Sequence, residues 1–155
     1  MEYRVGRAVC TGRAHLLAGL PCQDQIALCR SGEGGVCAAL ADGAGSRAKS
    51  DLGAACVTQC DAQLLCRRFD ALWAMEDRAL AETLTASCTR ALRRQALPAS
   101  ELASTLLFFA GHADGRYLAG HLGDGVLIWV QNGKSRVLSP PENGVIFINC
   151  AVNSL

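Results

Sequence analysis

Three aspartates stand where predicted strands begin or end: Asp24, Asp42 and Asp124. Asp42 directly follows the small apolar run Val36–Ala41, and glycines come after it. We expect a buried strand to carry this carboxylate at its C-terminal tip. A buried ionised carboxylate must be paired with a cation or bound to metal. The sequence therefore predicts that Asp42 is a metal ligand.

The predicted chemistry of this site is that of a hard divalent ion. Two carboxylates about 5 Å apart repel each other by about 3 kcal/mol at an effective dielectric constant near 20, and a divalent ion removes that penalty. Oxygen ligands without a His or Cys partner indicate Mg²⁺ or Mn²⁺ and not zinc. Such an ion lowers the pKa of a bound water, which can then attack phosphorus. Aspartate is also common in turns, so a turn-forming role for Asp24 and Asp124 stays open.

A predicted hairpin brings two of these acids together. The apolar runs Ile26–Cys29 and Val36–Ala41 flank the glycine-rich turn Ser31–Gly35, a pattern typical of two antiparallel strands. Asp24 begins the first strand and Asp42 ends the second, and these two ends are neighbours in an antiparallel pair. The sequence therefore predicts two adjacent carboxylates.

The remaining elements follow from periodicity. Residues at three- and four-residue steps predict helices over 50–69 and 76–96. The stretch 11–21 is interrupted by glycine and proline and is predicted to be a loop. Alternating or apolar runs predict strands over 3–10, 105–110, 117–122, 126–131 and 134–138, with a last apolar piece over 145–150. Strands, two adjacent helices, then strands favour an α+β fold over an alternating βαβ fold.

Composition excludes several classes of protein. Of 155 residues, 50% are hydrophobic and 19% charged, as in a globular domain, and the net charge of +1 argues against nucleic-acid partners. No apolar run approaches the ~20 residues of a membrane span, and the N-terminus has no signal-peptide pattern, so we expect a cytoplasmic protein without a membrane partner. Nine cysteines occur without CxxC spacing, and we expect them to be reduced, structural thiols.

Other catalytic patterns are weak. His15, His112 and His121 are too dispersed to suggest a triad, and neither GxSxG, a P-loop nor a dinucleotide fingerprint occurs. His112 lies beside a predicted turn and His121 within a predicted strand, so we expect both to be structural. His15, in a glycine-flanked segment upstream of Asp24, is the histidine that we consider for phosphate contact.

Four short motifs follow one another along the chain: Pro21–Asp24, Leu40–Ser46, Ser104–Leu106 and Gly120–Gly125. Their order around two central helices resembles that of the metal-dependent PP2C-type (PPM) serine/threonine phosphatases, and most of all the bacterial PP2C-like branch. The resemblance covers roughly residues 5–144. It implies an αββα sandwich, that is, antiparallel sheets flanked by helices.

The resemblance also implies a dinuclear Mg²⁺ or Mn²⁺ site between the sheets. Asp42 would bridge the ions, Gly43 would offer its backbone carbonyl, and Asp24 would be the second catalytic acid. Asp124 falls where the family has an acid associated with an additional, weaker metal. A metal-activated water would hydrolyse phosphoserine or phosphothreonine directly, so the implied partner is a phosphoprotein substrate.

The chain departs from the family pattern near its N-terminus. Gly19 replaces the usual basic residue that binds phosphate, which leaves His15 or Arg13 as substitutes. Ala44 stands where some members carry a histidine proposed as general acid.

The larger departure is C-terminal. Glu142 is the one acid after Asp124, so the family's C-terminal metal ligands are missing. We therefore expect residues 1–144 to be the N-terminal portion of a PP2C-like domain and residues 145–155 to be a divergent tail. Phosphatase activity is expected to be weak or absent. A non-catalytic regulatory module with the phosphatase fold stays open, as does a degraded gene product.

Overall fold

The computed structural model describes residues 2–32, 34–139 and 144–151, with the backbone alone over the last range. The helices are α1 (Arg13–Ala18), α2 (Ser50–Trp73), α3 (Asp77–Arg93) and the 3-10 helix η1 (Ala99–Leu102). The strands are β1 (Asp24–Arg30), β2 (Val36–Asp42), β3 (Leu106–Gly111), β4 (Arg116–Gly123), β5 (Leu127–Gln131), β6 (Lys134–Ser139) and β7 (Gly144–Ala151). In the described ranges, no helix has a stretch long and apolar enough to cross a membrane.

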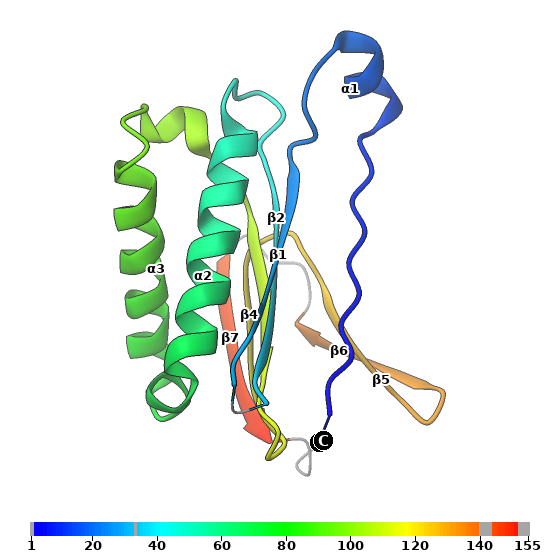
Figure 1. Ribbon diagram of the computed structural model, residues 1–155, viewed down its shortest axis with the longest axis vertical. Coiled ribbons are helices and arrows are strands. Elements are labelled where there is room, and N and C mark those ends of the chain that lie inside the picture. The colour runs from blue at the N-terminus through cyan, green and yellow to red at the C-terminus, as the bar shows by residue number, and fades with distance from the viewer. Residues whose placement is uncertain (1, 33, 140–143, 152–155) are drawn as a thin grey trace.

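Two antiparallel sheets and one helix layer make up the fold. Five strands form a sheet in the order β1-β2-β3-β4-β7, and β5 pairs with β6 in a separate two-stranded sheet. Helices α2 and α3 cover one face of the large sheet, whereas the β5–β6 hairpin and the N-terminal segment lie on its other side (Figure 1). The predicted α+β class is confirmed. The described residues supply the helix, sheet and sheet layers of the expected sandwich.

The small residues of β2 decide which face each side chain occupies. Cys37, Ala39 and Ala41 are buried toward α2, where the first two join a core cluster that includes Leu65. Successive side chains of a strand point to opposite faces. Leu40, which lies between Ala39 and Ala41, therefore points away from the helices and remains 40% exposed. Asp42 follows Ala41 and points to the same side as Leu40.

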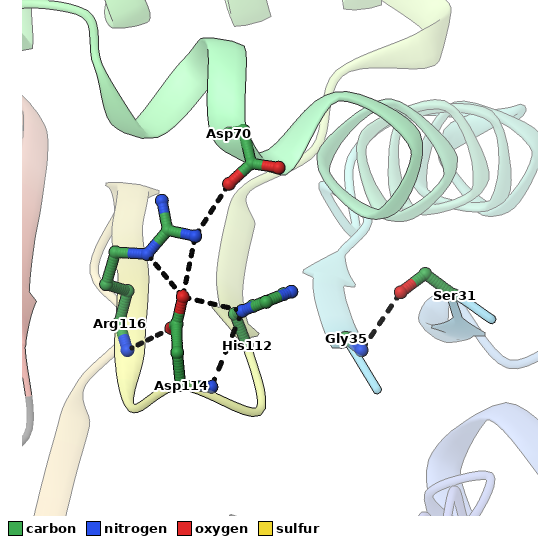
Figure 2. Close-up of polar contacts among 6 residues, drawn as sticks. All are labelled: Ser31, Gly35, Asp70, His112, Asp114 and Arg116. Atoms are coloured by element: carbon green, nitrogen blue, oxygen red, sulfur yellow. Dashed lines mark hydrogen bonds and ion pairs between the residues drawn. The ribbon is translucent and has the colours of Figure 1, made fainter. Parts of the chain in front are cut away.

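An ion-pair network closes the opposite end of the sheet, where β3 turns into β4 (Figure 2). The guanidinium of Arg116 lies 2.6 Å from Asp70 of α2 and 2.7 Å from Asp114 of the turn. The same group lies 5.4 Å above the centre of the Phe69 ring. Hydrogen bonds from Arg116 hold the pKa of Asp114 well below its usual range, and His112 also contacts that carboxylate at 2.9 Å. The network fastens the β3–β4 turn to the C-terminal half of α2.

The predicted hairpins, both long helices and the strands from residue 105 onward are confirmed within a few residues. Two N-terminal expectations are wrong. Residues 3–10 run extended but join neither sheet, and their contacts use side chains, such as the Arg7 hydrogen bond to the carbonyl of Ile26 at 3.1 Å. The expected loop contains α1, because good helix formers precede Gly19, whose left-handed φ of 64° ends the helix.

A close approach of two helices makes Gly53 of α2 sensitive to substitution. A Cβ atom there would lie 2.0 Å from the carbonyl oxygen of Leu102 in η1. Gly53→Ala should therefore destabilise the fold by about 2 kcal/mol or more, although alanine is normally the better helix former by about 1 kcal/mol. Urea denaturation measures the change. Gly6→Ala, which meets nothing within 4 Å, is the matched control, and equal effects of the two would contradict the packing.

Helix α2 also carries a carboxylate into the core. Asp61 is fully buried, and neither carboxylate oxygen has a hydrogen-bond partner among the described residues. Burial first, and then the charge of Cys60, raises the pKa of Asp61 to about 7. The other ionisable groups that interact with it are the thiols of Cys37 and Cys88.

Asp61 should therefore make stability depend on pH. With a pKa that is raised on folding, the native state binds more protons than the unfolded chain between about pH 4 and pH 7, so this contribution to stability is lost as the pH rises through that range. Between these pH limits the parent protein should lose roughly 4 kcal/mol of unfolding free energy that Asp61→Asn keeps. Urea unfolding of both proteins at several pH values tests this. Parallel pH profiles would contradict it.

Candidate metal centre

The β1–β2 hairpin places two acids opposite each other. In the antiparallel register, Asp24 is the direct partner of Asp42. The adjacency predicted from the sequence is confirmed. Thr105, just before β3, fixes the backbone of Asp42 from the other side, because its hydroxyl accepts the Asp42 N–H at 2.9 Å and its own N–H donates to the Asp42 carbonyl at 2.9 Å.

The two carboxyl groups interact directly. Burial raises the pKa of Asp42, and the charge of Asp24 and a hydrogen bond with Asp24 raise it further. The charge of Asp124 adds a smaller increase. The metal-free site thus has crowded negative charge, which is the condition that a bound cation relieves.

All three predicted acids border one cavity of about 400 Å³ on the face of the sheet opposite α2 and α3. Asp124 reaches the cavity because β4 ends at Gly123, whose left-handed φ of 112° turns the chain. The chain then passes so close to Leu107 that a Cβ atom on Gly125 would lie 3.1 Å from the Leu107 side chain. The other lining residues are Ala8, Val9, Cys10, Gln25, Ile26, Leu40, Ala41, Thr105, Leu107 and Gly125.

Gly43 is required by the start of α2. A Cβ atom there would lie 2.8 Å from both the carbonyl carbon and the carbonyl oxygen of Ser50. The Gly43 N–H donates to the carbonyl of Gln23 at 3.1 Å, whereas its own carbonyl receives no hydrogen bond from the residues that the structure describes. This carbonyl is therefore available as a ligand beside Asp42.

The two residues predicted to contact phosphate are placed elsewhere. Arg13 and His15 belong to α1, which stands apart from α2 and α3 at one end of the molecule (Figure 1). Neither residue lines the cavity. The structure therefore brings Asp24, Asp42, Gly43 and Asp124 to one region and leaves the two basic residues outside it.

Sequence reasoning missed two parts of the cavity. Residues 8–10, expected in a strand, instead form one wall. The sequence places Thr105 in a motif and at the start of the strand predicted over 105–110, but the pairing of that strand with β2, which brings the Thr105 hydroxyl to Asp42, follows only from the structure.

The donor set fits one side of a site for Mg²⁺ or Mn²⁺. Two carboxylates in contact and a free carbonyl are oxygen ligands, which these ions prefer. Across the described ranges, however, no group of three or more His, Cys, Asp or Glu side chains is arranged to hold a metal. Asp124 therefore borders the cavity without completing a three-acid cluster.

Removing one acid should change the titration of its neighbour. Asp24→Asn takes away the nearest negative charge, so the pKa of Asp42 should fall toward its usual value. The carboxyl carbon shift of Asp42, followed by NMR against pH in metal-free protein, reports this. Asp124→Asn should lower the same pKa less. An unchanged pKa in Asp24→Asn, or a larger fall in Asp124→Asn, would contradict the arrangement.

Comparisons with known proteins identify the fold and the family of the chain. The family model of protein phosphatase 2C matches residues 11–149. The solved phosphatase domain of the cell fate determinant SpoIIE from Bacillus subtilis has a similar fold, with a TM-score of 0.56 at 15% sequence identity. The match covers 86% of this chain but only 56% of that chain. No curated protein matches. Since the family match extends over most of its length, the chain belongs to the protein phosphatase 2C family.

Proposed function

We propose that this chain is a metal-dependent phosphatase for phosphoserine and phosphothreonine, with its Mg²⁺ or Mn²⁺ site built on Asp24 and Asp42. The observation that carries the proposal is the contact of these two carboxylates at the rim of a cavity, in a chain of the protein phosphatase 2C family. A cavity of about 400 Å³ has room for a phosphorylated side chain.

Each part of the site has a defined task in this proposal. Asp42 and Asp24 hold the ions, and the carbonyl of Gly43 adds a ligand from the backbone. When bound, the metal acidifies water and withdraws charge from the phosphoryl oxygens. Thr105 keeps Asp42 in position through its two backbone contacts. Asp124 borders the same cavity, affects the pKa of Asp42 less than Asp24 does, and is assigned to a weaker, additional ion.

The proposed activity is low for this chain alone. The contact joins two carboxylates, and no group of three or more His, Cys, Asp or Glu side chains that could hold a metal ion forms in the part of the chain that the structure describes. Fewer charged ligands hold a divalent ion more weakly. His15 and Arg13 are the residues assigned to the substrate phosphate, but neither lines the cavity, and this separation also lowers the expected activity.

The test is hydrolysis of a phosphothreonine peptide with and without Mn²⁺. We expect slow, Mn²⁺-dependent release of phosphate, and Asp42→Asn should lower it by about tenfold or more because the central ligand loses its charge. Calorimetry should give a dissociation constant for Mn²⁺ on the order of millimolar, because two carboxylates supply few charged ligands.

Asp77→Asn is the matched control. Asp77 is an exposed acid in the first turn of α3, far along the chain from the cavity residues, and its substitution should leave both measurements unchanged. Metal-independent hydrolysis, or full activity in Asp42→Asn, would refute the proposed site. Complete absence of Mn²⁺ binding by the parent protein would refute the proposed function.

A further inference from the structure

The interface between α2 and α3 holds a pair of thiols that the phosphatase site does not use. Cys60 of α2 lies against Cys88 of α3, and the two side chains are hydrogen-bonded. The hydroxyl of Ser87 lies 3.3 Å from the Cys60 sulfur. Cys60 is half-buried and thus reachable from solvent, whereas Cys88 is only 9% exposed.

From this arrangement we propose that Cys60 and Cys88 form a hydroperoxide-reactive dithiol, in which Cys60 is oxidised first and Cys88 then closes a disulfide between α2 and α3. This inference is independent of the proposed phosphatase activity. It also revises the expectation that every cysteine has only a structural role.

The surroundings of Cys60 favour its reactive form. Thiolate, and not thiol, is the nucleophile in cysteine oxidation. The hydrogen bond from Cys88, the one from Ser87 and the charges of Arg90 and Arg94 lower the pKa of Cys60 to about 6, against the effect of burial. An accessible thiol of this kind beside a second cysteine is the usual composition of a redox-sensitive site.

The two steps balance. The Cys60 thiolate attacks one peroxide oxygen, the O–O bond breaks, and the released hydroxide takes a proton to become water, which leaves a sulfenic acid on Cys60. The Cys88 sulfur then attacks the Cys60 sulfur, the S–O bond breaks, and the hydroxyl leaves with the Cys88 proton as a second water. The two thiols supply two electrons, and the hydroperoxide accepts both.

Cys88 is suited to the second step and not to the first. The pKa of its thiol is raised, first because it donates a hydrogen bond to Cys60 and then because it is buried. Conversion of Cys60 to a neutral sulfenic acid removes the first cause. Cys88 also borders a cavity of about 220 Å³, which gives its side chain room to change rotamer.

The chain contains its own control pair. Cys29 of β1 and Cys66 of α2 are also hydrogen-bonded to each other, but burial and then Cys29 raise the pKa of Cys66 to about 12. No arginine or hydroxyl is among the groups that act on Cys66. Cys66 therefore has less thiolate character than Cys60, and the Cys29–Cys66 pair should stay reduced.

The experiment treats the reduced protein with limiting hydrogen peroxide at pH 7, quenches it with an alkylating agent and maps the peptides by mass spectrometry without reduction. Cleavage on the N-terminal side of Asp61 separates Cys60 from Cys66. We expect a Cys60–Cys88 linked peptide that forms on the order of tenfold faster than a Cys29–Cys66 link, because the thiolate fraction is higher.

Variants separate the two steps. Cys88→Ser should stop at a sulfenic acid on Cys60 that a 1,3-dione captures, Cys60→Ser should leave Cys88 unmodified, and Cys66→Ser should not change the rate. Circular dichroism checks that each variant is folded. Equal or faster linkage of Cys29 with Cys66, linkage of Cys60 to its helix neighbour Cys56, or no dione capture on Cys60 in folded Cys88→Ser would overturn the proposal.

Discussion

The antiparallel register of β1 with β2 is the constraint on which the site depends. It sets Asp24 directly opposite Asp42, so two like charges share one edge of the sheet. A shift by one residue would turn every side chain of a strand to the other face, and Asp42 would then point into the apolar layer beneath α2. Burial of Cys37 and Ala39 against α2 stabilises the observed register, and the core thereby holds the acids together.

The helix face and the cavity face of the sheet have different tasks. Small side chains of β2 allow α2 to pack closely, and the same closeness requires glycine at position 53 against η1 and at position 43 against Ser50. On the other face, Ile26, Leu40 and Leu107 stay partly exposed beside the cavity, and the N-terminal segment and the chain after β4 build its walls. The packed helix face thus supports an open cavity, as expected for a site on a rigid scaffold.

The ionisable side chains of α2 show how strongly their surroundings change their pKa values. Cys60 and Cys66 lie on the same helix, yet hydrogen bonds and arginines lower the pKa of one, while burial raises that of the other. Asp61, the residue next to Cys60, is buried without a hydrogen-bond partner among the described residues. Such differences do not follow from residue type, because desolvation and neighbouring charges determine them.

The α+β class, both long helices, the hairpins and the adjacency of Asp24 and Asp42 could be predicted from the sequence, because periodicity and turn residues act locally. Three features could not be predicted: residues 8–10 form a cavity wall, Thr105 holds Asp42, and Arg13 and His15 stand outside the cavity. The pairing of Cys60 with Cys88 could not be predicted from the sequence either. These contacts join segments far apart in the chain, and their formation depends on how the layers pack.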